Sequence, residues 1–317
     1  GGSFVISAKG QKVARAPAWR EGLFPVHISQ EQGGQLNLVG EVVAKESDLE
    51  MVYGGLVVGL RDYIEKNNFP SVVLGLSGGI DSAMTLALAV DAIGSDRVTT
   101  VMMPSKYTSQ MSLDDAADMA SRLNVTHSII SIDPIIEQFN TSLTEHFIGM
   151  SADITEENIQ ARSRGVLLMA LSNKTGAMVL STGNKSEMAV GYSTLYGDMA
   201  GGFSPLKDVY KSLVYRLADY RNNIQEIIPT RIISRPPSAE LAEEQLDQDS
   251  LPAYEILDVL LEQYIANDLC FEEMVSIGND PDLIAKVIGL VDRNEYKRRQ
   301  APPGIRITDR AFGRDRR

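Results

Sequence analysis

Six consecutive residues, Ser77-Gly78-Gly79-Ile80-Asp81-Ser82, have the types and spacing to bind a phosphate. They follow an apolar, β-branched run over 72–76 and precede a stretch rich in Ala, Leu and Met that ends at Gly94. This pattern predicts a buried strand, a tight glycine turn and a helix. At such a turn, backbone N–H groups and the positive end of the helix dipole face the same point. The hydroxyl groups of Ser77 and Ser82 add further donors.

The carboxylate of Asp81 requires a cation, because a carboxylate beside a bound phosphate is repelled unless a divalent ion lies between them. The lysine of a Walker A loop is absent, so this is a different type of phosphate loop. Glu187 provides a second carboxylate, and it follows a predicted strand over 177–181. We predict a magnesium site at Asp81 and Glu187, with Thr182 within reach of the nucleotide. The alternative is that Glu187 only stabilises the first turn of a helix.

The elements that must position these residues alternate along the chain. Strands are predicted over 72–76, 98–103, 127–132 and 177–181, and helices over 47–64, 81–93, 112–123 and 155–173. Alternation of this kind predicts an α/β fold, a doubly wound parallel sheet with helices on both faces. Ligands of such sheets bind at the carboxyl ends of the strands, where both predicted carboxylates lie.

Composition restricts the class of protein. The 317 residues are enough for one large α/β domain with extra segments, and 44% of them are hydrophobic. The net charge of −12 argues against a nucleic-acid partner, which would need a basic face. We find no apolar stretch of membrane-spanning length and no secretory signal, and Cys270 is the one cysteine. These features predict a cytoplasmic enzyme without a disulfide framework or a zinc cluster.

The first residues do not look like the start of a domain. Short β-branched runs at 4–6 and 13–15 flank a turn signal, and this hairpin needs other strands to pair with. We therefore expect 1–30 to be the end of a larger domain and 31–46 to be a linker. The main domain is predicted over 47–317, because Ser47 and Glu50 form a capping box. An expression remnant at the first three residues is the alternative.

The loop at 77–82 resembles the pyrophosphate loop of the N-type ATP pyrophosphatases, which split ATP into AMP and pyrophosphate. Further segments resemble the NAD synthetase family in order, from about residue 47 to 305. They are 157–164, 181–192, 196–198, 235–241 and 296–300. The details resemble the glutamine-dependent bacterial members, and residues 1–17 are similar to the end of their nitrilase-like glutaminase domain, the rest of which is missing from this chain.

The resemblance implies amidation of deamido-NAD to NAD with ATP and Mg²⁺, using ammonia here and glutamine in the full-length enzyme. Implied ATP contacts are Gly75, Leu76, Ser77, Gly78, Gly79, Ile80, Asp81, Ser82, Thr182, Lys211 and Ser238. Implied contacts to deamido-NAD are Asn158, Arg162, Glu187, Tyr192, Leu195, Lys297 and Arg298. The catalytic set is Asp81, Glu187, Lys211 and Asp198, with Asp198 placed where ammonia enters.

Some of these assignments carry specific structural expectations. Lys211 is expected one turn into a helix that begins near Asp208, and Arg164 is expected at the surface or an interface. Leu195 stands where the small ammonia-dependent enzymes have a lysine. The segment 234–252 is too long for an ordinary connection, so we predict a lid over ATP. The resemblance also implies a homodimer, with the helices over 52–64 and 157–171 as candidate interfaces.

Two other functions fit the phosphate loop. One is a different ATP-pyrophosphatase amidotransferase, such as a GMP synthetase, which differs in its nucleobase pocket. The other is a non-catalytic sensor of adenine nucleotides. A sensor has no need of Glu187 opposite Asp81, so that pair favours an enzyme.

Overall fold

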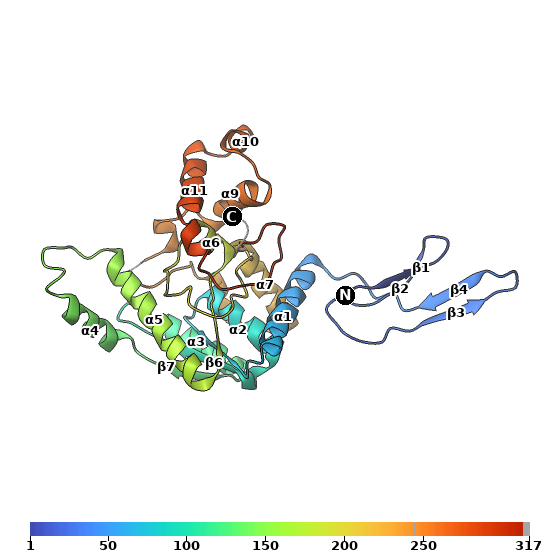
Figure 1. Cartoon of the computed structure of the whole chain (residues 1–317), viewed down its shortest axis with the longest axis horizontal. Coiled ribbons are helices and arrows are strands. Elements are labelled where there is room, and N and C mark those ends of the chain that lie inside the picture. The colour runs from blue at the N-terminus through green and yellow to red at the C-terminus, as the bar shows by residue number, and fades with distance from the viewer. Residues whose placement is uncertain (244, 313–317) are drawn as a thin grey trace. The chain divides into compact units, whose positions relative to one another are not determined.

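The computed structural model of the protein describes residues 1–243 and 245–312. The chain divides into two compact units, Gly1–Val58 and Gly59–Arg317, and α1 (Asp48–Lys66) contributes to both (Figure 1). The division therefore falls inside α1. The predicted start of the main domain at residue 47 had implied a division before this helix. Within the described residues, no helix combines the length and the apolar character that crossing a membrane requires.

The first unit contains two antiparallel hairpins. The first, β1 (Phe4–Ile6) with β2 (Lys12–Arg15), confirms the predicted hairpin. The second joins β3 (Val26–Gln30) to β4 (Leu36–Gly40) through a turn in which Gly33 and Gly34 adopt φ of +111° and +84°. The prediction of a linker over 31–46 is thus wrong for β4, because the two glycines form a hairpin turn that allows the flanking strands to pair.

The second unit is built on a parallel four-stranded sheet. Its strands are β5 (Val72–Gly75), β6 (Val98–Met102), β7 (Thr126–Ile129) and β8 (Met178–Leu180). They are ordered β7-β6-β5-β8 and all pairs are parallel, which confirms the predicted doubly wound sheet. The chain therefore reverses its winding between β5 and β8, and a ligand crevice is expected at their carboxyl ends.

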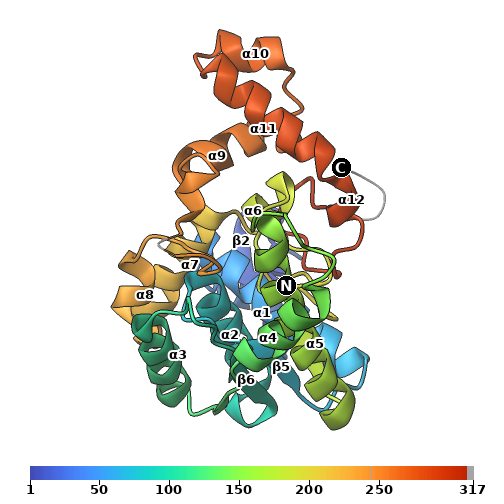
Figure 2. The same cartoon turned by 90° about the vertical axis from the view of Figure 1, so that its left-hand side faces the viewer.

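Helices cover both faces of this sheet (Figure 2). On one face, Val73, Val101 and Val179 form an apolar core with α5 (Ile154–Thr175) and with α4 (Asp133–Leu143), a helix that sequence periodicity did not predict. On the other face, α2 (Ile80–Ile93) packs against β5 and β6. Next along the chain after β6 comes α3 (Gln110–Arg122), which contacts β6 and β7.

A second apolar core lies among the helices that follow the sheet. It joins α6 (Lys185–Val190), α9 (Tyr254–Leu261) and α11 (Pro281–Arg293) through residues such as Met188, Leu257 and Val287. The remaining helices are α7 (Lys211–Ile224), α8 (Thr230–Ser234), α10 (Phe271–Ser276) and α12 (Glu295–Arg298). Because α6 belongs to this core, the helical layer fixes the loop that leaves β8.

Candidate active site

A cavity of about 390 Å³ lies at the carboxyl ends of β5, β6 and β8. Much of its wall comes from the loop between β5 and α2, one face of α5, the loop and helix that follow β8, and residues 235–241, 245 and 247. This is the edge of the sheet at which the sequence placed the phosphate loop. The fold therefore brings segments separated by more than a hundred residues into one site.

The predicted phosphate loop has the geometry of an anion site. Its helix, α2, begins at Ile80, and the N-cap residue Gly79 has no side chain to accept hydrogen bonds from the first-turn amides. These N–H groups therefore suit an anionic ligand. Gly78 has φ of +79°, and a Cβ there would lie 2.5 Å from the Ser112 carbonyl oxygen. Gly78 forms the turn and does not line the cavity, unlike the other predicted loop residues, Gly75, Leu76, Ser77, Gly79, Ile80, Asp81 and Ser82.

Three charged side chains meet beside this loop. The Nζ atom of Lys211 donates to Asp81 Oδ2 at 2.5 Å and to Glu187 Oε1 at 3.0 Å. The Lys211 side chain is 2% exposed, and the side chains of both carboxylates are 17% exposed. Asn184, the N-cap of α6, donates from Nδ2 to Asp81 Oδ1 at 2.9 Å and thereby orients that carboxylate. Asp81 and Glu187 thus face the same ammonium group at this sheet edge, and their binding of a metal ion stays a prediction.

Burial and mutual charge set the protonation of this cluster. Burial alone would lower the pKa of Lys211, but the carboxylates of Asp81 and Glu187 raise it, so its ammonium group stays charged. Burial raises the pKa of Glu187 to about 8, with Lys211 opposing and Asp81 reinforcing the shift. The cluster is therefore a cation held by two acids in a weakly solvated site, where charge acts strongly on a bound ligand.

Lys211 lies at the first position of α7. The sequence had instead suggested that it lies one turn inside a helix. A cation at a helix N-terminus is opposed by the helix dipole. The two carboxylates and the ring of Tyr254, whose centroid is 5.1 Å from the ammonium nitrogen, compensate for this. An unfavourable position that is maintained by three partners indicates that the charge is used.

Asp81 and Glu187 are the residues that could hold a divalent cation. The ammonium of Lys211 lies between them, so their spacing suits a positive charge. Within residues 1–243 and 245–312, no three His, Cys, Asp or Glu side chains gather closely enough to form a metal site by themselves. Two carboxylates are sufficient for Mg²⁺, which commonly keeps several waters and takes further ligands from substrate phosphates.

The predicted lid segment is attached to the phosphate loop and to the start of α3. Arg235 donates to the Gly78 carbonyl oxygen at 3.0 Å and to Ser112 Oγ at 2.8 Å. One oxygen of Glu240 accepts from Ser109 Oγ at 2.9 Å and from Ser112 Oγ at 2.8 Å. Ser238, which was predicted to contact ATP, lines the cavity between these two contacts. Residues 235–241 thus line the cavity next to the loop, and their action as a lid stays a prediction.

The predicted substrate residues divide into two groups. Asn158, Tyr192 and Lys297 line the cavity together with Thr182 and Glu187. Arg162 and Leu195 do not line it: Arg162 Nε donates to the Leu195 carbonyl oxygen at 3.2 Å, and the Arg162 side chain is exposed. Their role in binding deamido-NAD stays a prediction.

Arg298 requires a correction. It is 6% exposed, and its guanidinium donates to the carbonyl oxygens of Ala189 at 2.8 Å and Val291 at 2.7 Å. It therefore joins α6 to α11 and points away from the cavity. The sequence correctly indicated a cationic pair at the end of a helix, but adjacent residues on a helix face different directions.

A family model described as NAD synthase matches residues 52–301. The chain belongs to the NAD synthase family. It is 53% identical to the glutamine-dependent NAD(+) synthetase of Acinetobacter baylyi, over 100% of this chain and 59% of that protein. The chain thus spans less than two thirds of that relative's length.

Solved structures of the NAD synthase family agree with the fold. The glutamine-dependent NAD+ synthetase from Acinetobacter baumannii in complex with ADP matches with a TM-score of 0.71 and 50% identity, over 100% of this chain and 58% of that one. The NH3-dependent NAD synthetase from Campylobacter jejuni matches with a TM-score of 0.63 and 28% identity, over 80% of this chain and 96% of that one. The matched region is thus nearly the whole of the Campylobacter chain.

The cavity residues of this NAD synthase chain that were not predicted include Arg164 and Asp247. Arg164, expected at a surface, lines the cavity and donates from Nε to the Met103 carbonyl oxygen at 3.0 Å, and burial lowers its pKa to about 10. Its spacing from Ala161 and Leu168, which also line the cavity, was a usable helical signal. Asp247 also lines the cavity and accepts from the Tyr254 hydroxyl at 2.9 Å. It lies in an acidic stretch, so no local pattern distinguished it from its neighbours.

Asp198 lies at the cavity wall, where the NAD synthase resemblance placed ammonia entry. Its side chain is accessible from the cavity but surrounded by protein atoms, and this desolvation raises its pKa. The Thr194 amide donates to Asp198 Oδ1 at 2.6 Å. A carboxylate held in this way can accept hydrogen bonds from an ammonium ion and then its proton.

Proposed function

We propose that this chain catalyses the ATP-dependent amidation of deamido-NAD to NAD, with ammonia as the nitrogen donor and AMP and pyrophosphate as the other products. The observation that carries the proposal is the cluster of Lys211, Asp81 and Glu187 beside the phosphate loop. A nucleotide sensor would need the loop but not this cluster. Membership of the NAD synthase family and the ADP complex of the Acinetobacter baumannii neighbour support the same assignment.

The first half-reaction in this proposal is adenylation. The nicotinate carboxylate attacks the α-phosphorus of ATP, the bond to the β-phosphate oxygen breaks, and pyrophosphate leaves into the loop over 77–82. Negative charge develops on the leaving group, where the first-turn amides of α2 and the Lys211 ammonium can stabilise it. Asp81 and Glu187 would hold Mg²⁺, which when bound supplies additional positive charge to the phosphates.

The second half-reaction is attack by ammonia on the acyl-adenylate carbonyl carbon. The carbon–nitrogen bond forms, AMP leaves with the former carboxylate oxygen, and one proton is released. Asp198 is the proposed acceptor of that proton, because burial raises its pKa toward neutral pH, where a carboxylate accepts a proton more readily. The balance is one deamido-NAD, one ATP and one ammonia consumed for one NAD, one AMP and one pyrophosphate.

The nitrogen source tests this function. We expect the pure chain to make NAD with ammonium chloride and not with glutamine, because it spans 59% of the length of the glutamine-dependent relative from Acinetobacter baylyi, and the resemblance places the glutaminase residues in the remaining part. The rate at subsaturating total ammonium should rise with pH up to about tenfold per unit below the ammonium pKa, as free ammonia increases. Nicotinate mononucleotide and xanthylate serve as alternative acceptors. AMP formation with either acceptor and not with deamido-NAD would replace the proposed substrate, and glutamine-driven turnover would contradict the ammonia dependence.

Lys297 offers a second test at the substrate end of the cavity. Its Nζ donates to the carbonyl oxygens of Gly191 and Ser193 at 2.8 Å each, with capacity for one further bond. Lys297→Ala should raise KM for deamido-NAD about 5- to 150-fold, since one charged hydrogen bond is worth about 1–3 kcal/mol, with a smaller effect on KM for ATP. The matched control is Lys286→Ala, which removes an exposed lysine bonded to the Ser250 carbonyl oxygen. Equal changes in both variants would exclude a specific contact.

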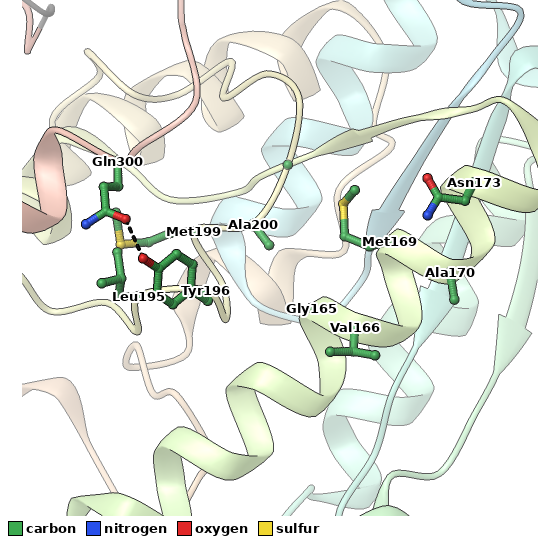
Figure 3. Close-up of a pocket in the computed structure, with 11 residues that line it drawn as sticks. Gly165, Val166, Met169, Ala170, Asn173, Leu195, Tyr196, Met199, Ala200 and Gln300 are labelled. Carbon is green, nitrogen blue, oxygen red and sulfur yellow. Dashed lines mark hydrogen bonds between the residues drawn. The ribbon is translucent and has the colours of Figure 1, made fainter.

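We also infer a homodimer that uses the exposed side of α5. Val166 is 68% exposed and Tyr196 is 66% exposed, and both border a hollow of about 510 Å³ (Figure 3). Tyr196 is oriented by a hydrogen bond from its hydroxyl to Gln300 Oε1 at 2.7 Å. Leu195 lines the same hollow and is bonded to Arg162, so a second copy there would meet the two predicted substrate residues that lie outside the cavity. Sedimentation velocity of the pure chain measures the dimer directly.

A further inference from the structure

The segment 302–312, which we name the C-terminal strap, runs along the residues that lead into α7. The amide of Ser204 donates to the Pro303 carbonyl oxygen at 2.9 Å, and Lys207 Nζ donates to the Pro302 carbonyl oxygen at 2.6 Å. At Gly304 the approach is so close that a Cβ would lie 2.5 Å from the Ser204 carbonyl oxygen. The strap is therefore in direct backbone contact with the segment that ends at Lys211.

Its central anchor is a buried ionic cluster. Lys185 is 0% exposed, and its Nζ donates to Asp208 Oδ1 at 2.6 Å, to Thr308 Oγ1 at 2.7 Å and to the Arg310 carbonyl oxygen at 2.9 Å. All three ammonium protons are thus used. Asp208 also accepts from the amides of Ile307 and Thr308, at 2.8 Å each. Two of the three groups bonded to Lys185 Nζ come from the strap, and so do three of the four groups bonded to Asp208, so the strap completes the cluster.

This cluster lies directly behind the proposed catalytic residues. Lys185 is the first residue of α6 and precedes Glu187 by two positions, while Asp208 precedes Lys211 by three. Neither Lys185 nor Asp208 lines the cavity. The Lys185 amide also donates to the Val209 carbonyl oxygen at 2.9 Å, so the two segments that carry Glu187 and Lys211 are joined at this point.

We propose that the C-terminal strap, through Thr308, Lys185 and Asp208, positions Glu187 and Lys211 against each other for adenylation. The proposal rests on the function proposed above, because it assigns the strap to the same reaction. The three side chains are positioning residues, since they contact catalytic segments and not substrate. A buried ionic cluster is a costly way to gain stability, whereas its directional bonds fix orientation. Small displacements of catalytic groups reduce rates strongly.

Thr308→Val in the full chain tests the proposal. It nearly preserves volume but removes the hydroxyl that Lys185 Nζ and Asp208 both contact. We expect kcat for AMP formation to fall by about 10-fold or more, with KM for ATP changed less than about twofold, because the phosphate loop is untouched. Thr308→Ser keeps the hydroxyl and should restore the wild-type rate. The matched control is Thr144→Val, which removes a hydroxyl bonded to the Asn140 carbonyl oxygen in an exposed part of the chain.

Amide hydrogen exchange gives a readout that does not depend on activity. In Thr308→Val the amides of α6 and of the first turn of α7 should exchange faster, and those of α2 should be unchanged. A rate within about twofold of wild type for Thr308→Val, or equal faster exchange in α2, α6 and α7, would overturn the proposal. If the wild-type chain makes no NAD, the proposed function fails, while the exchange pattern still decides whether the strap orders α6 and α7.

Discussion

Lys211→Met should lower kcat for AMP formation by about 100-fold or more, the loss typical of removing one group that stabilises developing charge. The Lys211 ammonium lies between Asp81 and Glu187 at 2.5 and 3.0 Å, beside the loop proposed to receive pyrophosphate. Methionine fills a similar volume without the charge. The two carboxylates would then repel each other and the phosphates, so the substitution removes an attraction and adds a repulsion. The measurement is the single-turnover rate of AMP release from ATP with deamido-NAD and ammonium.

The fold must survive this substitution for the result to be informative. Removing one member of a buried ion pair destabilises a protein by about 3–5 kcal/mol. Both carboxylates here are 17% exposed, and Glu187 already has a raised pKa, so protonation of Glu187 limits that cost. Thermal unfolding measures the change, and Lys211→Arg, which keeps the charge, should retain more activity than Lys211→Met. A Lys211→Met rate within about threefold of wild type would remove Lys211 from the proposed mechanism.

Asp81→Asn and Glu187→Gln should each reduce magnesium-dependent adenylation by about 100- to 1,000-fold. Each substitution keeps the shape of the side chain but removes one of the two negative charges proposed to hold Mg²⁺. The measurement is the rate of AMP release as a function of magnesium concentration. Binding of Mn²⁺ in the presence of ATP should weaken in parallel, which reports on the ion independently of turnover.

A matched control separates the metal role from a general charge effect. Glu255→Gln removes an exposed carboxylate in the first turn of α9, outside the cavity, and should change neither the rate nor Mn²⁺ binding. Full adenylation by Asp81→Asn or Glu187→Gln at ordinary magnesium concentration would refute the metal assignment. Slow adenylation with unchanged Mn²⁺ binding would instead assign these carboxylates to holding Lys211.

The elements that position the site could be predicted because their signals are local. The strand, turn and helix around residues 77–82 follow from β-branched residues, two glycines and a helix-forming stretch, and each is present. The parallel sheet follows from the alternation of strands with helices. Together these two facts place Asp81 and Glu187 at one sheet edge without any knowledge of the contacts between them.

The contacts themselves are not encoded locally. Lys211 contacts Asp81 across 130 positions of sequence. It does so from the N-terminus of α7, because that helix begins at Lys211. Arg298 follows Lys297 directly, yet only Lys297 lines the cavity, because a turn of α12 directs Arg298 toward carbonyl oxygens of α6 and α11. Tertiary packing, and not residue type, decides which of two adjacent cations reaches the cavity.

The error over 31–46 has a simple physical origin. Paired glycines in a polar stretch are equally typical of a linker and of a hairpin turn. The strand that follows, β4, has alternating but weakly apolar residues and pairs with β3 over five residues. The first hairpin has a partner nearby in the sequence, because the Val43 amide donates to the Arg15 carbonyl oxygen, but no local pattern encodes that contact.

The central claim is that a carboxylate is activated by transfer of AMP at this cavity, and an isotope measurement tests it most directly. Deamido-NAD labelled with ¹⁸O in its nicotinate carboxylate is incubated with the pure chain, ATP, Mg²⁺ and ammonium chloride, and the products are analysed by mass spectrometry. We expect each AMP to carry one ¹⁸O atom, the NAD amide to retain the other, and pyrophosphate to carry none. Label in inorganic phosphate or pyrophosphate, or unlabelled AMP formed together with NAD, would contradict it.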